Sequence, residues 1–244
     1  MAVEQPSDSV DDRTRRRPTY GAGQHYLGDS GREYLAYQRR TAEVGAALNA
    51  RKFAPYIGPT DTVLDFGCGI GATLAQLDCA HRLGVEINDL ARLEAHKRGI
   101  ACVSDLSEIA DGSVDVVISN HALEHVPYPI DALRQMRQKL REGGTLVLCV
   151  PLSDWRNEKR YRASDPNHHL QTWTPLLLGN TLTEAGFAVT PDDIRIFTHA
   201  WSRRFTRLDD VLPRPAFDRI CWGWAVIRRA RQLIAVVQIK GPHR

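Results

Sequence analysis

The chain has 244 residues, of which 43% are hydrophobic and 25% charged, with a formal net charge of +3. These values are typical of a globular α/β protein and exclude disordered and fibrous classes, and the small charge disfavours binding to duplex nucleic acid. The first ten residues lack the apolar segment of a secretory signal, and no apolar run is long enough to span a bilayer. Five scattered cysteines without a CxxC pair indicate reduced thiols, so we expect a cytoplasmic protein without disulfides.

The chain begins with a polar segment and continues with a helical one. Residues 1–20 combine acids with the basic run RTRRRP, which predicts a disordered tail. Residues 21–56 contain apolar side chains at helical spacing, which predicts an N-terminal helix.

Short apolar runs then alternate with helical patterns. Strands are predicted at 62–66, 82–86, 101–103, 114–119 and 145–150, and helices at 71–78, 89–97 and 130–140, the last ended by Gly143-Gly144. Another helix is predicted from Trp173 to Ala185, with Thr174 as its N-cap. Strand-like PDDIRIF and QLIAVVQIK flank a helix-like segment near the C-terminus. This alternation predicts a doubly wound, mostly parallel α/β sheet whose core spans residues 57–200.

The segment 201–244 is basic and is expected to form a helix and the final strand of the sheet. It carries ten basic and three acidic side chains. Its helical pattern places Phe217, Ile220, Trp224 and Ile227 on one face. Two interpretations stay open, because such a helix packs on a sheet or lies on an anionic membrane surface.

The most informative motif is TVLDFGCGIG, residues 62–71, followed by Glu86 at the end of a second strand. Gly67, Gly69 and Gly71 allow backbone conformations closed to other residues and let a ligand lie against the loop. Glu86 is placed to accept hydrogen bonds from a ribose. The motif predicts a site for an adenosine-containing cofactor, and because it also fits G-x-G-x-x-G/A, it does not by itself exclude a nicotinamide dinucleotide.

Three further features favour one cofactor. Asp65 immediately before the glycines would repel a pyrophosphate but suits an ammonium group. Asp105 follows the third predicted strand and is suited either to accept from an adenine amino group, beside the backbone N–H of Leu106, or to cap the next turn. The run DVVISNHALEHV, residues 115–126, precedes a helix and LREGGTLVLCVP.

Together these motifs resemble the class I S-adenosylmethionine-dependent methyltransferases over roughly residues 30–200. The resemblance implies a seven-stranded sheet whose last strand is antiparallel. It also implies S-adenosylmethionine as the cofactor, with the methionine part held at Asp65, Gly67, Gly69 and Gly71, the ribose at Glu86 beside Ile87, the adenine at Asp105 and Leu106, and the methyl sulfonium near Asn120 and His121.

A base is needed when the methyl acceptor is a hydroxyl, and histidine suits this role near neutral pH. His121, His125, His168 and His169 are the candidates, of which His125 and His169 are predicted as catalytic. Asp165, Glu124, His168 and His169 show no spacing typical of a metal site, and no metal is predicted.

The segments HYLGDSGREYLAYQRR and NHHLQTWTPLLLGN resemble methyltransferases encoded with bacterial polysaccharide genes. This resemblance implies that the helix over residues 21–56 is an N-terminal lid, whose Tyr26, Tyr34 and Tyr37 either pack on a sugar ring or hold the helix against the sheet. The sequence therefore predicts methyl transfer to an oxygen of a small-molecule or glycan acceptor, in cell-surface polysaccharide biosynthesis. No nucleic-acid partner is expected, since the chain lacks the [DN]PP[YF] motif of base-amino methyltransferases. The alternatives are a non-catalytic cofactor-binding module and a nicotinamide-dependent oxidoreductase, although a catalytic Tyr-x-x-x-Lys is missing.

Overall fold

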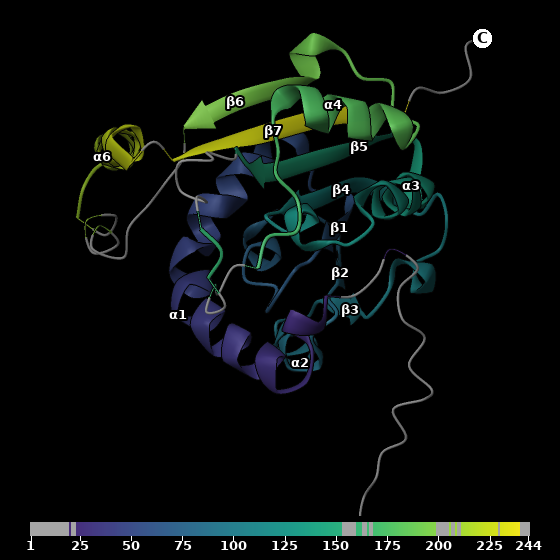
Figure 1. The fold of residues 1–244 in the computed structure, drawn as a ribbon, viewed down its shortest axis with the longest axis horizontal. Helices are drawn as coiled ribbons and strands as arrows, with labels where there is room; N and C mark the ends of the chain where they lie inside the picture. Colours follow the sequence, from purple (N-terminus) through teal and green to yellow (C-terminus); the bar gives the residue numbers. More distant parts are fainter. Residues whose placement is uncertain are drawn as a thin grey trace, which may run out of the picture.

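The computed structural model describes residues 20, 23–152, 160–162, 165, 168–198, 205, 208, 211–228 and 230–239. Seven strands form one sheet in the order β3-β2-β1-β4-β5-β7-β6, shown in Figure 1. The strands are β1 (Thr62–Phe66), β2 (His81–Val85), β3 (Ala101–Val103), β4 (Val114–Asn120), β5 (Leu140–Pro151), β6 (Ile194–Thr198) and β7 (Arg231–Gln238). β1 to β5 pair in parallel, and β7 runs antiparallel to both β5 and β6. The predicted fold class, including the antiparallel last strand, is confirmed.

Helices cover both faces of the sheet. They are α1 (Gly28–Phe53), α2 (Asp89–Lys97), α3 (Pro129–Lys139), α4 (Pro175–Glu184) and α6 (Arg214–Arg228). Side chains alternate between two buried clusters along β4: Val117 joins the helices α3 and α4, whereas Val116 and Ile118 join Phe53 of α1. This alternation follows from the two-residue period of a strand and makes the sheet doubly wound. Within the described residues, no helix is long and apolar enough to cross a membrane.

Two predicted boundaries are wrong. The helix predicted at 71–78 is a single short turn at Leu74–Gln76, because Gly71 still has a positive φ of 73° and the chain must enter β2 at His81. The glycine pair 143–144 does not separate α3 from β5, since α3 ends at Lys139 and β5 begins at Leu140. The glycines lie inside β5, where the register with β4 shifts.

The N-cap at Thr174 is confirmed, because its hydroxyl accepts a hydrogen bond from the backbone N–H of Leu177 at 3.2 Å. The predicted tail lies outside the described residues except for Tyr20, which is buried and therefore not part of a disordered segment. The helix predicted over the lid segment is α1, which lies on the side toward which the β5 arrow points in Figure 1. The side chain of Tyr37 lies outside the described residues.

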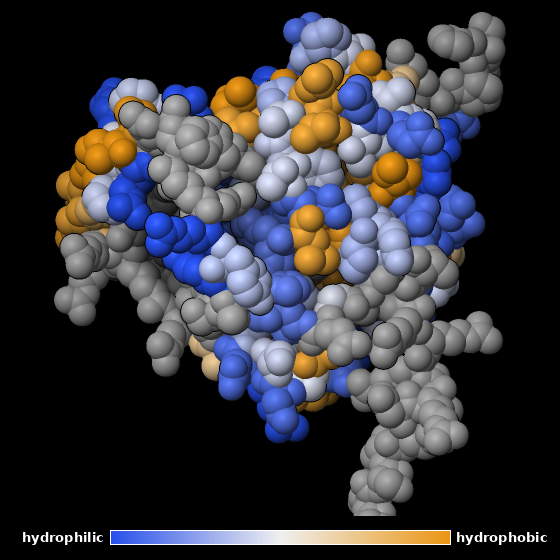
Figure 2. Space-filling view, in the orientation of Figure 1, coloured by the Kyte–Doolittle hydropathy of each residue, from blue (hydrophilic) through white to orange (hydrophobic). Residues whose placement is uncertain are grey.

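The face predicted for α6 needs correction. Phe217 is fully buried and Trp224 packs edge-on against Phe205, with their ring centroids 5.5 Å apart. The exposed apolar side chains of α6 are Ile220, Trp222, Val226 and Ile227. The helix thus packs through one face and leaves a second apolar face exposed, seen as orange atoms over α6 in Figure 2. A period of 3.6 residues does not distinguish the two faces when both are apolar.

Candidate active site

The glycine loop turns sharply between β1 and the short turn at 74–76. The backbone N–H groups of Gly67 and Cys68 both donate to the carbonyl of Val85, at 2.8 and 3.2 Å, so the loop is fixed to the end of β2. Gly67 has a φ of 76°, and a Cβ there would lie 2.4 Å from that of Ala122. Glycine is therefore required here by packing against the segment after β4 as well as by the backbone conformation.

The carboxylate of Glu86 clamps this loop. One oxygen accepts from the backbone N–H of Gly69 at 2.9 Å, and the other accepts from the N–H of Asn88 at 2.8 Å. Burial raises the pKa of Glu86, while these N–H groups oppose the rise. A carboxylate has room for about four hydrogen bonds, so Glu86 keeps acceptor capacity toward a ligand while it orients the loop.

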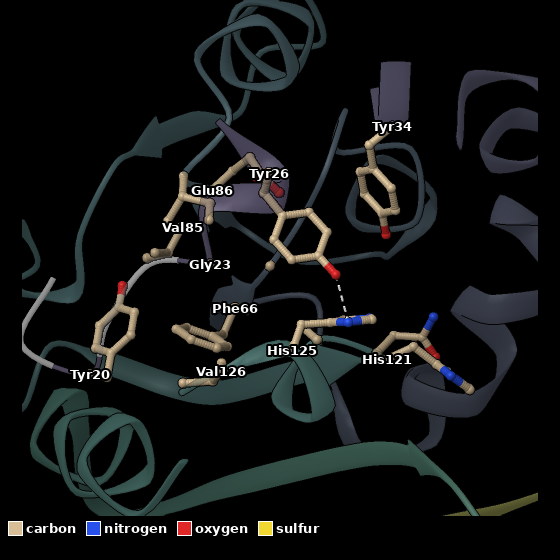
Figure 3. A pocket seen from close by; sticks show the side chains of 14 residues that line it. Tyr20, Gly23, Tyr26, Tyr34, Phe66, Val85, Glu86, His121, His125 and Val126 are labelled. Atoms are coloured by element: carbon tan, nitrogen blue, oxygen red, sulfur yellow. Dashed lines mark hydrogen bonds between the residues drawn. The ribbon is translucent and has the colours of Figure 1, made fainter. Parts of the chain in front are cut away.

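Two cavities adjoin the loop, and Gly67 and Asn120 line both of them. Figure 3 shows the first, whose wall includes tyrosines and histidines: its lining is Tyr20, Gly23, Tyr26, Tyr34, Phe66, Gly67, Val85, Glu86, Ile87, Asn120, His121, Ala122, His125 and Val126. The second is lined by Asp65 and the glycine loop. An elongated ligand lying over Gly67 can therefore reach Glu86 at one end and Asp65 at the other.

Asp65 is buried at the end of β1, and burial together with the nearby Glu86 raises its pKa to about 7. A cationic ligand in the second cavity would favour the ionised carboxylate. The residue is thus suited to an ammonium group, and its protonation changes near neutral pH.

Binding of S-adenosylmethionine should therefore weaken as the pH falls below 7. Asp65 must release its proton to face the cationic ligand, so the affinity should fall by up to about tenfold per pH unit below the pKa of Asp65. Calorimetry between pH 5.5 and 8.5 measures this dependence. Asp65→Asn is the control and should bind weakly with no such slope, whereas a flat profile in the wild type would contradict the assignment.

Asp105 and Leu106 lie deeper than predicted. Asp105 is 9% exposed and Leu106 fully buried, and neither lines the two cavities. One oxygen of Asp105 accepts from the N–H of Ser107 at 2.7 Å as part of a capping box with Glu108. The other oxygen is buried without a hydrogen-bond partner. Asp105 therefore caps the turn and also has one carboxylate oxygen available.

The end of β4 carries an ion pair between a half-buried histidine and a buried glutamate. His121, with a positive φ of 55°, places Nδ1 3.3 Å from Oε1 of Glu124, which is fully buried. Burial opposes the charge on both groups, but a hydrogen bond with Cys149 and the attraction of Glu124 raise the pKa of His121 to about 9, and His121 in turn lowers the pKa of Glu124. The adjacent Asn120 accepts from Lys52 of α1 at 2.8 Å, and Lys52 also donates to Gln232 of β7 at 3.1 Å.

His125 faces the first cavity, as predicted. The Tyr26 hydroxyl lies 2.6 Å from its Nδ1, drawn as the dashed line in Figure 3, and its Nε2 lies 3.9 Å from Glu124. Burial lowers the pKa of His125. The charge of Glu124 opposes this decrease, and nearby His169 adds to it. Burial raises the pKa of Tyr26. At neutral pH the imidazole is therefore neutral and the phenol un-ionised, and the tautomer with an unprotonated Nδ1 accepts a hydrogen bond from the Tyr26 hydroxyl.

His169 packs against His125, with ring centroids 5.0 Å apart, but is not among the residues lining the first cavity. Donor atoms of Glu124, His125 and His169 lie within 4.8 Å of one another, so these three residues are able to hold a metal ion. Asp165 and His168, the other candidate metal ligands, are not part of this three-residue group. Asp165 instead accepts a hydrogen bond from the backbone N–H of His168 at 3.1 Å.

The chain matches a family model described as "methyltransferase domain" over residues 35–191. The chain belongs to this family. Its sheet order and glycine loop make it a class I S-adenosylmethionine-dependent methyltransferase, and the predicted cofactor is confirmed at the level of the family. Glu86 and Asp65, which line the two cavities, fit that cofactor's hydroxyl and ammonium groups.

Several known proteins are similar to this methyltransferase. The ubiquinone biosynthesis O-methyltransferase of Xanthomonas campestris is 35% identical over 105 residues, which cover 38% of this chain and 44% of that protein. The enzyme of the same name from Roseobacter denitrificans is 29% identical over 184 residues, 68% of each chain. This chain thus spans less than half of the first of these relatives.

Solved structures share the fold at low identity. A Thermotoga maritima S-adenosylmethionine-dependent methyltransferase, described as a possible histamine N-methyltransferase, has a TM-score of 0.62 and 15% identity, covering 85% of this chain and 97% of its own. A Haemonchus contortus phosphoethanolamine N-methyltransferase, solved with S-adenosylhomocysteine, has a TM-score of 0.53 and 17% identity, covering 86% and 60%.

Four residues of the site escaped the sequence-based prediction of the methyltransferase. The sequence places Tyr20 in a tail, leaves Tyr26 open between packing on a sugar and packing on the sheet, considers Glu124 only as a metal ligand, and does not single out Lys52. The contact between Tyr26 and His125 joins residues far apart in the sequence, so no local motif indicates it. Lys52 follows Arg51 at the end of a long helix, and nothing in that local pattern indicates a buried lysine.

Proposed function

We propose that this methyltransferase transfers a methyl group from S-adenosylmethionine to a hydroxyl oxygen of a small-molecule or glycan acceptor. The observation that carries the proposal is the row Tyr26–His125–Glu124, in which Tyr26 and His125 line the first cavity and the buried Glu124 lies behind His125. A neutral histidine backed by a buried carboxylate is suited to remove a hydroxyl proton. The name O-methyltransferase of two relatives supports oxygen as the methyl acceptor.

The residues of the chain chiefly bind and orient. S-adenosylmethionine, when bound, supplies a methyl group already activated by its sulfonium. Glu86 and Asp65 would hold its two ends, and Asn120 and His121 would border the transfer position. Positioning two reactants in this way contributes about 7–11 kcal/mol to lowering a barrier. The aromatic wall formed by Tyr26 and Tyr34 would exclude water and contact the acceptor.

His125 would take the proton as the methyl group is transferred. Because its pKa lies below the usual 6.5, the imidazole is neutral at pH 7, and in the tautomer with an unprotonated Nδ1 it accepts a hydrogen bond from the Tyr26 hydroxyl. The acceptor hydroxyl would donate to the Tyr26 oxygen, and that proton would move along the same hydrogen bond to Nδ1. Glu124 would stabilise the imidazolium that forms.

A binding and turnover assay tests the proposal. Thermal shifts should increase with S-adenosylmethionine and S-adenosylhomocysteine but not with NAD, which tests the nicotinamide alternative. An assay of radiolabelled methyl transfer to a panel of phenols, monosaccharides and nucleotide sugars should identify a hydroxyl acceptor. EDTA should not change the rate of this transfer. Loss of turnover with EDTA would instead assign Glu124, His125 and His169 to a metal, and binding without any turnover would favour a non-catalytic module.

The resemblance to polysaccharide-cluster enzymes stays a prediction about the acceptor. In the source organism, deletion of the gene should lower the mass of a surface glycan by one methyl group. A missing methyl on a soluble aromatic metabolite would instead assign a small-molecule acceptor. Either result supports transfer to oxygen if the lost group is an ether methyl.

The exposed face of α6 supports peripheral contact with an anionic membrane. Trp222 is 60% and Ile227 76% exposed, and the exposed Arg219 and Arg228 lie on the same helix. The acidic residue of this helix, Asp218, pairs with Arg51 of α1 at 3.0 Å. Exposed tryptophan and aliphatic residues beside arginines are typical of helices that lie in a membrane interface.

Wild-type protein should therefore co-sediment with vesicles containing phosphatidylglycerol at low salt and less so at high salt. The variant Trp222→Ser/Ile227→Ser should lose binding because the buried apolar area is gone, and Arg219→Gln/Arg228→Gln because each basic residue contributes about 1 kcal/mol near an anionic surface. Leu176→Ser, which changes an exposed leucine on α4, is the matched control. No co-sedimentation of the wild type at low salt would contradict the proposal.

A further inference from the structure

Tyr20 lies inside the cofactor region although it precedes every helix of the fold. Its side chain is 2% exposed, its ring packs edge-on against Phe66 with centroids 5.4 Å apart, and its carbonyl accepts from the N–H of Tyr128 at 3.1 Å. Figure 3 shows the ring at one end of the first cavity, which Glu86 and Ile87 also line. Tyr20 is thus a wall of the site on the side where an adenosine would extend beyond Glu86.

The two groups assigned to adenine lie behind this wall. Asp105 and Leu106 are buried and line neither cavity. The Tyr20 hydroxyl and the free oxygen of Asp105 are both buried without a hydrogen-bond partner. Tyr20 and Leu106 belong to the same buried cluster of the core. Burial, the charge of Asp105 and contact with its carboxylate raise the pKa of Tyr20, while the backbone N–H of Leu106 opposes the rise. The hydroxyl therefore lies beside both groups.

Asp105 and Leu106 can form hydrogen bonds either with an adenine or with the Tyr20 hydroxyl. Asp105 offers an acceptor and Leu106 a backbone donor, side by side. The Watson–Crick edge of adenine presents the complementary pair, an amino donor next to a ring-nitrogen acceptor. A phenol hydroxyl also donates one hydrogen bond and accepts another. Tyr20 therefore offers in one group what adenine offers in two.

We propose that Tyr20 occupies the adenine position of the cofactor site in the free protein and leaves it when S-adenosylmethionine or S-adenosylhomocysteine binds. The inference rests on the proposed function, and it takes Asp105 and Leu106 as the adenine contacts that the family resemblance implies. The ring and an adenine cannot both contact these buried groups, so the ligand competes with a residue of the chain. If the open state makes up about 0.1–10% of the molecules, the affinity measured is about 10- to 1,000-fold below that of the open site.

The competing arrangement predicts the opposite sign. If Tyr20 stays in place and stacks on a bound adenine, its removal weakens binding because an aromatic contact is lost. The effect of Tyr20→Ala on affinity therefore separates displacement from stacking. Stability of the ligand-free variant, measured by thermal unfolding, shows whether the fold survives the loss of a buried ring.

Calorimetry with S-adenosylhomocysteine is the decisive measurement. Tyr20→Ala should bind about tenfold or more tightly than the wild type, and Tyr20→Phe should show a smaller gain because only the hydroxyl is removed. Tyr128→Ala, which removes an exposed aromatic side chain next to the Tyr20 carbonyl, should bind like the wild type. Weaker binding by Tyr20→Ala would overturn the proposal, and no binding by the wild type would overturn the proposed function itself.

Two further measurements apply if Tyr20→Ala does not fold. In protein labelled with 3-fluorotyrosine, the Tyr20 resonance, assigned through Tyr20→Phe, should move to a solvent-exposed position when S-adenosylhomocysteine is added. S-inosylhomocysteine, which replaces the adenine amino donor with a carbonyl, should bind about tenfold or more weakly than S-adenosylhomocysteine if the base reaches Asp105. An unmoved resonance or equal affinities would contradict displacement.

Discussion

His125→Ala should lower kcat by about 10²–10⁴ while leaving the affinity for S-adenosylhomocysteine unchanged, because it removes a base and no predicted cofactor contact. In the wild type, kcat should also fall at low pH. The pKa of His125 is lowered from 6.5. At a pH above this lowered pKa the imidazole is neutral and active, and at a pH below it the imidazole is protonated and inactive. Burial in an apolar site disfavours the imidazolium and is the main cause of this lowered pKa.

Two variants sharpen this test. Tyr26→Phe should lower kcat as well, since it removes the hydroxyl 2.6 Å from Nδ1 of His125, whereas a base acting without Tyr26 would leave kcat intact. His169→Ala should have a small effect, because His169 contacts the ring of His125 without lining the first cavity. If none of these variants slows turnover, proton removal by this row of residues is excluded.

Glu86→Ala should weaken the binding of S-adenosylmethionine by about 1.5–3 kcal/mol, because hydrogen bonds from the ribose to a charged group are lost. The loop adds to this loss, since Glu86 also accepts from the N–H of Gly69 and holds it in place. Calorimetry measures the change in affinity.

Asn88→Ala is a matched control for Glu86→Ala. Asn88 caps α2 through its side chain and accepts from two backbone N–H groups, but it does not line either cavity. This variant should lose about 0.5–2 kcal/mol of stability with an unchanged affinity. If Glu86→Ala binds the cofactor as tightly as the Asn88→Ala control does, Glu86 is not part of the site.

The strands could be predicted because central parallel strands are buried on both faces and read as uninterrupted apolar runs, as in 114–119. The short turn at 74–76 could not, because local helix propensity does not show how soon the chain must enter β2. Position along the chain sufficed for Glu86 and His125, each directly after an apolar strand or turn. The roles of Tyr20 and Glu124 depend on burial by distant segments: the Glu124 carbonyl, for example, accepts from the N–H groups of Leu170 and Gln171.

The buried ammonium of Lys52 has a consequence for how the protein is divided. It joins the C-terminal end of α1 to Asn120 at the end of β4 and to Gln232 of β7, and the neighbouring Phe53 is fully buried. Detaching this helix would expose an apolar ring and break both hydrogen bonds at once. The first helix therefore cannot be removed as a detachable cover, and a shortened protein that starts at the glycine loop should lack a cooperative thermal transition.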